Sequence, residues 1–140
     1  MSYVIRRPLF ADLIFDEQGQ IVKTVYIGAV PHYVVPDGDF QRHVEAEHVD
    51  RQIVRLMQER ILAMRDFITA GVIQMLGRED LFTQASIEHA IKNMDRILEP
   101  GNVDVDELRT TLWMLKFRAI VNVHGDVVRL DVPGWEEEEI

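Results

Sequence analysis

The segment HVEAEHVDRQ, residues 43–52, places two histidines and three acids within one short run. Imidazole and carboxylate groups bind divalent cations and also act as general bases. On an α-helix each residue turns by about 100°, so helical spacing sorts the run into two groups. Glu47 and Asp50 fall on the same side as His43, whereas the second histidine and the first acid fall on the opposite side. The spacing therefore predicts one candidate set, formed by His43, Glu47 and Asp50.

Two kinds of chemistry fit this set. The imidazole and the two carboxylates could ligate a divalent cation if another element supplied a fourth ligand, for which His32 and His89 are the candidates. The same groups could instead hold a general base. The simpler alternative is ion pairing at i,i+4, of Glu47 with Arg51 or with the histidine, and of the aspartate with a neighbouring arginine. We favour ion pairing because arginines flank the set, and we expect no cofactor other than such a cation.

These side chains need a helix to bring them together. Residues 37–39, Asp-Gly-Asp, form a loop that ends in a good helix-capping residue, and no proline or glycine follows until Gly71. We therefore predict one long helix over residues 39–76, with an earlier end near residue 70 as the alternative. Such a helix outruns the sheet of a small domain, so part of its apolar stripe needs a second chain. The predicted homodimer interface consists of Ile53, Met57, Ile61, Met64 and Ile68.

Strands are predicted at both ends of the chain. Residues 8–28 have the β-branched and aromatic composition of a hairpin, and residues 32–35 could add a third strand. AIVNVHGDVVRLDV, residues 119–132, alternates apolar and polar side chains around a turn at Gly125-Asp126. This pattern predicts a second, C-terminal hairpin.

Two further helices are predicted between the hairpins. The first begins at Thr83 or Ser86 and ends before Glu99-Pro100-Gly101, and the next begins at Asp104 or Asp106. The order of elements predicts an α+β fold. In this fold the two hairpins form a single antiparallel sheet, and three helices, the first of them long, pack on one face of that sheet.

Residues 107–132 run helix, strand, turn, strand, which in outline resembles the last helix and wing of a winged-helix domain. The contacts to nucleic acid would come from four basic residues, Arg109, Lys116, Arg118 and Arg129. Acidic residues at the start of that helix and a net charge of -9 repel a polyanion. We therefore rank nucleic-acid binding below the other functions.

Length and composition narrow the class of protein. The 140 residues, 47% of them hydrophobic and 28% charged, predict one globular domain over residues 1–134, followed by an acidic tail over residues 135–140. The chain has no cysteine, which excludes disulfides and thiolate sites, and no apolar run long enough to cross a membrane. We expect a cytoplasmic location and no membrane partner.

The sequence contains no dinucleotide-binding, P-loop, hydrolase or HExxH motif. We therefore expect a non-enzymatic, homodimeric interaction or regulatory module that associates through the helix over residues 39–76, with a further protein partner as an open option. The first alternative is a metal-binding protein or metal-dependent enzyme built on His43, Glu47 and Asp50. The second is the winged-helix-like protein.

Overall fold

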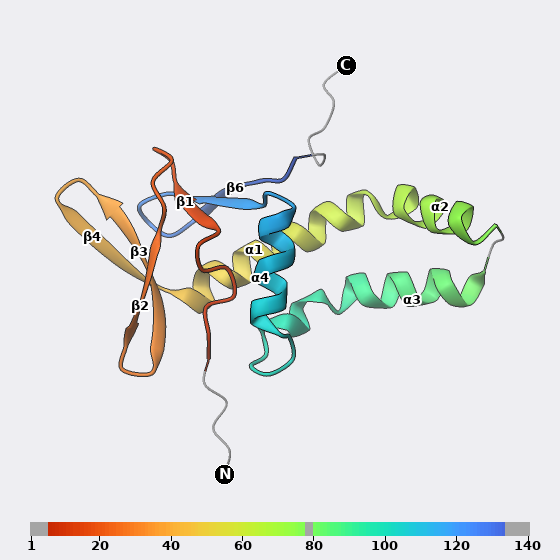
Figure 1. The fold of residues 1–140 in the computed structure, drawn as a ribbon, viewed down its shortest axis with the longest axis horizontal. Coiled ribbons are helices and arrows are strands. Elements are labelled where there is room, and N and C mark those ends of the chain that lie inside the picture. The colour runs from red at the N-terminus through yellow and green to blue at the C-terminus, as the bar shows by residue number, and fades with distance from the viewer. Residues whose placement is uncertain (1–5, 78–79, 134–140) are drawn as a thin grey trace, which may run out of the picture.

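The computed structural model describes residues 6–77 and 80–133, and within them it shows an α+β fold. Six strands, four α-helices and one 3-10 helix follow one another in these parts of the chain (Figure 1). The strands are β1 (Ile14–Asp16), β2 (Lys23–Ile27), β3 (Val30–Asp37), β4 (Phe40–Glu45), β5 (Arg118–Val121) and β6 (Val127–Asp131). The helices are α1 (Ala46–Ala63), α2 (Arg65–Leu76), α3 (Leu81–Lys92), the 3-10 helix η1 (Met94–Leu98) and α4 (Val105–Met114).

The strands form two three-stranded sheets, so the predicted single antiparallel sheet is wrong. One sheet has the order β1-β5-β6, in which β1 runs parallel to β5 with Ile14 opposite Ala119, and β6 is antiparallel to β5. The other is an antiparallel meander in the order β2-β3-β4. The predicted hairpin over residues 8–28 does not form, because β2 pairs with β3 and β1 pairs with β5, and only a bridge between Phe15 and Ile21 joins its two halves. The predicted C-terminal hairpin and the strand at residues 32–35 are confirmed.

The long helix begins later than predicted and is interrupted. Residues 40–45 pair with β3 as strand β4, and Asp39 lies in the turn between the two strands rather than at a helix start. Gly38 makes this turn possible with a φ of 60°, a left-handed conformation that glycine adopts without a Cβ clash. The helix then runs from Ala46 and breaks at Met64, which separates α1 from α2.

The helix starts further along the chain are set by aspartates. Asp80 caps α3, with its carboxylate accepting from Phe82 N at 3.0 Å, so the start predicted at Thr83 or Ser86 is wrong. The start predicted at Asp104 is confirmed, because its carboxylate accepts from Glu107 N at 3.1 Å. Each side chain satisfies a backbone donor that the first helical turn leaves without a partner.

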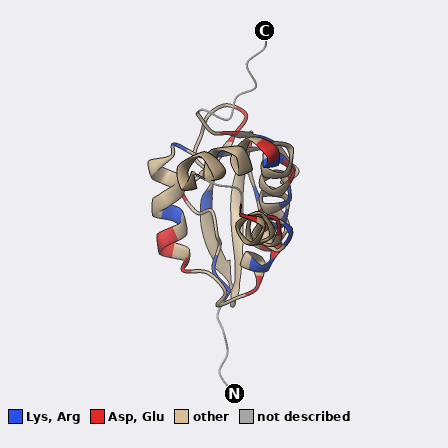
Figure 2. Cartoon of the chain, turned by 90° about the vertical axis from the view of Figure 1, so that its right-hand side faces the viewer, with Lys and Arg blue, Asp and Glu red and all other residues tan. Residues whose placement is uncertain are grey.

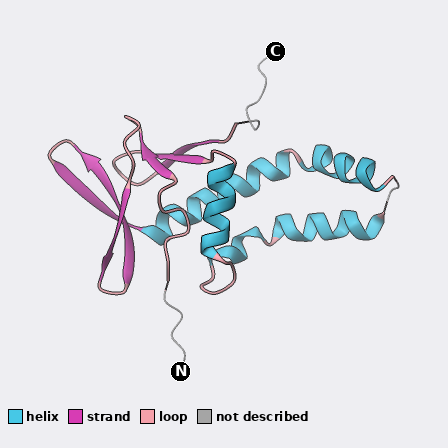
Figure 3. Cartoon of the chain, viewed as in Figure 1, coloured by secondary structure: helices cyan, strands magenta, loops and turns pink. Residues whose placement is uncertain are grey.

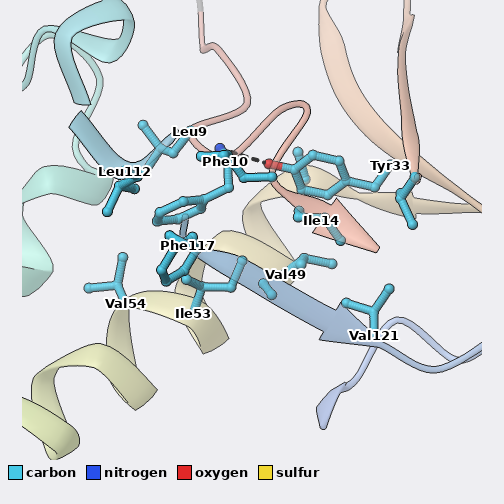
Figure 4. Packing of buried hydrophobic residues seen from close by; sticks show 14 of the residues in the cluster. Leu9, Phe10, Ile14, Tyr33, Val49, Ile53, Val54, Leu112, Phe117 and Val121 are labelled. Atoms are coloured by element: carbon cyan, nitrogen blue, oxygen red, sulfur yellow. Dashed lines mark hydrogen bonds between the residues drawn. The ribbon is translucent and has the colours of Figure 1, made fainter. Parts of the chain in front are cut away.

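The core lies where α1, β1, β3 and β5 meet. Figure 4 shows Ile14, Ile53 and Phe117 packed together, and the rings of Phe10 and Phe117 lie 5.9 Å apart between centroids. Full burial of one such side chain stabilises a fold by about 1.5–3 kcal/mol. The described residues outside 65–92, which we call the body, are therefore held together by apolar contacts between segments that are far apart in the sequence.

The two ends of the molecule differ in construction. In Figure 1 the meander β2-β3-β4 lies at one end, and α2 and α3 extend side by side from the other, as Figure 3 shows by element type. Helix α2 has no buried residue, and α3 has only Ile91. Within the described residues, no helix combines the length and the apolarity needed to cross a membrane.

Candidate functional site

The predicted set of His43, Glu47 and Asp50 does not lie on one helix face in the structure. His43 lies on β4, where its side chain is exposed and its Nδ1 is 3.1 Å from the carbonyl oxygen of Gln41. Glu47 lies in the first turn of α1, half-buried, and Asp50 lies one turn further on, buried in the body. The helical phasing that joined the three residues does not hold, because it assumed a helix at residue 43.

Glu47 forms ion pairs with two arginines. Its Oε1 lies 2.6 Å from Arg51 Nη2 at i,i+4 and 3.6 Å from Arg6 Nη1. The predicted pair with Arg51 is thus present. Because the side chains of Glu47 and Arg51 are both more than a third exposed, solvent screening leaves this pair at most about 1 kcal/mol of stabilisation.

The two histidines proposed as extra ligands lie elsewhere. His32 is half-buried on β3, with Nδ1 3.0 Å from the carbonyl oxygen of Val30. His89 is exposed near the end of α3, with Nδ1 3.3 Å from Nδ2 of Asn93. Over residues 6–77 and 80–133, no three histidine, aspartate or glutamate side chains gather in a group that could hold a metal ion.

Asp50 is the one residue of the predicted set that is buried. It is 3% exposed, and its two carboxylate oxygens accept separate hydrogen bonds. Oδ1 accepts from the Tyr33 hydroxyl at 2.5 Å and Oδ2 from Leu9 N at 3.0 Å, while the Tyr33 hydroxyl accepts from Phe10 N at 3.2 Å. Asp50 thereby joins α1, β3 and the segment that precedes β1 (Figure 4 shows Tyr33 and Phe10). The sequence placed Asp50 beside the apolar stripe but predicted an arginine partner in place of Tyr33.

Burial dominates the charge state of Asp50. Removal from water raises the pKa of Asp50 to about 7, although the hydrogen bonds from Tyr33 and Leu9 N and the charges of Arg6 and Arg109 all lower it. The same burial, together with the adjacent carboxylate, raises the pKa of the Tyr33 hydroxyl well above its usual value. Tyr33 is therefore a neutral donor at physiological pH, and Asp50 exchanges its proton near neutrality.

A cavity of about 230 Å³ adjoins Asp50. The side chains of Arg6 and Arg7 line it together with apolar residues from η1 and from the loop before α4, among them Ile97, Leu98 and Val103. A titratable group at the wall of a cavity that is lined by both apolar and polar residues is a common feature of ligand-binding sites. Asp50 and this cavity form the candidate ligand site.

The apolar stripe predicted as a dimer interface is covered in part by the chain itself. Ile53 and Met57 are 0% and 7% exposed and belong to the core, so the prediction is wrong for these two residues. Ile61, Met64 and Ile68 are half-buried. An interface of helix α1 alone therefore has too little free surface.

The free apolar surface lies instead on α2 and α3, which we call the helical hairpin (residues 65–92). Phe67 and Met75 on α2 are 78% and 88% exposed, and Leu81 and Phe82 on α3 are 81% and 79% exposed. Sequence reasoning missed α3 as part of this surface. The available signal was the run LFTQASI, residues 81–87, which carries no charge and contains four apolar residues.

The four basic residues considered for nucleic-acid binding do not form one free surface. Arg109 is half-buried and donates to the carbonyl oxygen of Pro8 at 2.7 Å, and Arg129 pairs with Asp131 at 3.1 Å. The guanidinium of Arg118 lies 4.3 Å from the centre of the Phe15 ring, and Lys116 is exposed with a φ of 59°. Figure 2, which views the molecule from the end where α2 and α3 extend, shows basic and acidic segments interspersed. Such a surface attracts a polyanion weakly.

Comparison with known proteins adds no assignment. No protein-family model, no curated protein and no solved structure matches this chain.

Proposed function

We propose that the protein is a non-enzymatic interaction module that forms a homodimer through the exposed face of its helical hairpin. The observation that carries the proposal is that the 12 residues of α2 include no buried residue, although eight of them are apolar or glycine. A helix that is apolar on several sides and unburied in the monomer requires another surface to cover it.

The exposed apolar side chains of the hairpin provide a substantial part of a stable interface. Phe67, Met75, Leu81 and Phe82 are each more than three-quarters exposed, and Leu76 is 52% exposed. Aromatic side chains bury about 150–250 Å² each, so the two phenylalanines alone offer on the order of 300 Å², and the methionine and the two leucines add to this area. Stable protein interfaces bury roughly 800 Å² on each partner. The hairpin of one chain therefore supplies a substantial part of a standard interface.

The chemistry of this face favours a second copy of the same chain. Residues 67–77 and 81–87 contain no charged side chain, so a partner selected by charge finds no complementary group there. Phe67, Gly71 and Met75 recur every four residues along α2, and a Cβ at Gly71 would meet nothing within 4 Å. Small residues between large apolar ones allow two helices to approach closely. Two hairpins related by a twofold axis would form a four-helix bundle with matching apolar faces.

Size-exclusion chromatography with light scattering at low micromolar concentration tests the proposal. We expect the mass of two chains for the unaltered protein and of one chain for the double variant Phe67→Glu, Phe82→Glu. The matched control is Trp113→Glu, because Trp113 is 71% exposed and lies outside the hairpin on α4. The control should remain dimeric. A monomeric unaltered protein, or dissociation by the control but not by the hairpin variant, would refute the proposal.

A further inference from the structure

Asp50 combines three features that have separate consequences. It is buried, it accepts one hydrogen bond at each oxygen, and it lines the cavity beside η1. A carboxylate has about four acceptor positions, so two of them remain after Tyr33 and Leu9 N are counted. A buried carboxylate is costly unless a cation compensates its charge.

The arginines near Asp50 form hydrogen bonds or ion pairs with other groups, although the buried Nε of Arg109 has no hydrogen-bond partner among the described residues. Arg6 Nη1 lies 3.6 Å from Glu47 Oε1, and the Nη2 of Arg109 donates to the carbonyl oxygen of Pro8. Arg7 donates to Asp106 at 2.9 Å. The charges of Arg6 and Arg109 lower the pKa of Asp50, but burial outweighs them. An additional cation in the cavity would therefore favour the ionised form of Asp50.

The residues that line the cavity and its volume determine what the uncharged part of a ligand can be. Leu9, Ile97, Leu98, Val103 and Val105 provide an apolar lining. The volume is about 230 Å³. An apolar cavity of about 150 Å³ accommodates a benzene molecule. The available space therefore fits one ring, or a short alkyl chain, together with a small polar group.

We propose that this cavity binds a small organic ammonium ion, whose N–H groups donate to the Asp50 carboxylate and whose apolar body lies against Leu9, Ile97 and Leu98. This binding site is separate from the helical hairpin and does not depend on dimer formation. It assigns to the body of the molecule a ligand-binding role in addition to its role as a scaffold.

The charges around the cavity favour a cation over an anion. Two arginines, Arg6 and Arg7, line it, against three acids, Asp50, Glu99 and Asp104. Each arginine also has an acidic partner outside the lining, Glu47 for the first and Asp106 for the second. The nearby field is therefore acidic in sum, and a ligand carboxylate would be repelled by Asp50 itself.

Binding of a cation must depend on pH through Asp50. An ammonium ion pairs with the ionised carboxylate, so the affinity rises as pH increases through the pKa of Asp50, about 7. The other groups that face Asp50 are the guanidinium groups of Arg6 and Arg109 and the hydroxyl of Tyr33, which is neutral because burial raises its pKa. No histidine is among the described residues that line the cavity. The pH dependence thus reports on a single group.

Titration calorimetry and ligand-detected NMR with benzylammonium chloride test the proposal on the full chain. Binding at about pH 8 should be roughly tenfold or more tighter than at about pH 5.5, in line with ionisation of one carboxyl group. Benzyl alcohol, which has the same ring but no charge, should bind at least tenfold more weakly at the higher pH. Equal binding of the two probes, binding without pH dependence, or no saturable binding at about pH 8 would each overturn the proposal.

Two variants distinguish loss of ligand binding in the cavity from loss of the fold. Leu98→Trp fills the cavity from the half-buried side of η1 and leaves Asp50 and its hydrogen bonds in place. Asp50→Asn removes the charge. Each should abolish binding of benzylammonium, whereas Glu59→Gln, which removes an exposed acid of α1 away from the cavity, should bind as the unaltered protein does. If Asp50→Asn does not fold, Leu98→Trp decides alone. Retained binding in a folded Leu98→Trp protein overturns the assignment.

Discussion

The body and the helical hairpin are built from similar kinds of residue and use them differently. In the body, apolar side chains from α1, β1, β3 and β5 bury one another, and the buried Asp50 has hydrogen-bond partners at both oxygens. In the hairpin, Phe67 and Phe82 remain more than three-quarters exposed. Apolar spacing therefore identifies a helix, but it does not say whether the same chain or another one covers the helix.

The difference follows from which segments reach each region. The body is closed by contacts between distant parts of the chain, such as the pairing of Ile14 with Ala119. The hairpin is attached near its base, where Gln58 of α1 donates to the carbonyl oxygens of Ile91 at 3.0 Å and Lys92 at 3.2 Å. No described segment from elsewhere in the chain covers the outer halves of α2 and α3.

Truncation of one large apolar side chain in each region should give the largest contrast. Ile53→Ala, at a fully buried position, should lower the free energy of unfolding by about 2–5 kcal/mol. Phe67→Ala, at a position 78% exposed, should change it by less than about 0.5 kcal/mol at a concentration where the protein is monomeric. Urea denaturation measures both values. Similar losses at both positions would show that the hairpin is packed within the monomer.

The charge of Asp50 should make the stability of the body depend on pH. The folded-state pKa of about 7 lies above the usual 3.8, so the folded protein binds this proton more tightly than the unfolded chain does. The resulting stabilisation is complete below pH 3.8 and is lost as pH rises through about 7. A shift of about three units corresponds to roughly 4 kcal/mol.

Asp50→Asn has no such proton. From about pH 5 to about pH 8, urea denaturation should therefore show the unaltered protein losing on the order of 2–3 kcal/mol relative to this variant. Stability curves that stay parallel over this interval would contradict the charge state assigned to Asp50.

Two glycines with left-handed backbones extend the comparison. Gly125 in the β5–β6 turn has a φ of 79°, and an added Cβ would lie 2.7 Å from Val44 Cγ1. Gly77 after α2 has a φ of 73°, and an added Cβ would meet nothing within 4 Å. Both alanine variants incur about 1 kcal/mol of backbone strain, and overpacking adds roughly 1–2 kcal/mol at Gly125 alone. Thermal denaturation should give a lower melting temperature for Gly125→Ala than for Gly77→Ala. The reverse order would show that the hairpin is packed more tightly than the body.

The smallest effect concerns the two capping aspartates. Loss of either cap costs about 1 kcal/mol. For Asp104→Ala, in the body, this cost should appear in the global free energy of unfolding. For Asp80→Ala, in the hairpin, it should appear as faster hydrogen exchange in α3 with little change in global unfolding, because the hairpin opens locally. Equal global losses would indicate that hairpin and body unfold as one unit.

Local signals in the sequence predicted the parts of the fold that depend on neighbouring residues. The turn at Gly125-Asp126 and the helix start at Asp104 are of this kind, because the conformation and the capping hydrogen bond each involve a few adjacent residues. Strand β4 was missed because FQRHVE has no alternating pattern and is exposed at nearly every position. Only its pairing with β3 makes it a strand.

The candidate sites were predictable to different degrees. Helical spacing located Asp50 at the border of the apolar stripe, which is where a buried acid would lie. Its partners Tyr33 and Leu9 come from segments whose approach depends on the tertiary fold, so spacing could not identify them. The apolar stripe along residues 53–68 was also visible in the sequence. Which part of it stays exposed depends on the elements that cover α1, and these bury Ile53 but leave Phe67 exposed.

Hydrogen–deuterium exchange at two protein concentrations tests most directly whether the hairpin, unlike the body, is covered by a second copy of the chain. If the body is complete in one chain and the hairpin requires a second copy, raising the concentration from well below to well above the dimer dissociation constant should slow exchange in α2 and α3. Exchange in α1, β3 and β5 should stay the same. Concentration-independent exchange in the hairpin, or slowing confined to the body, would contradict the account.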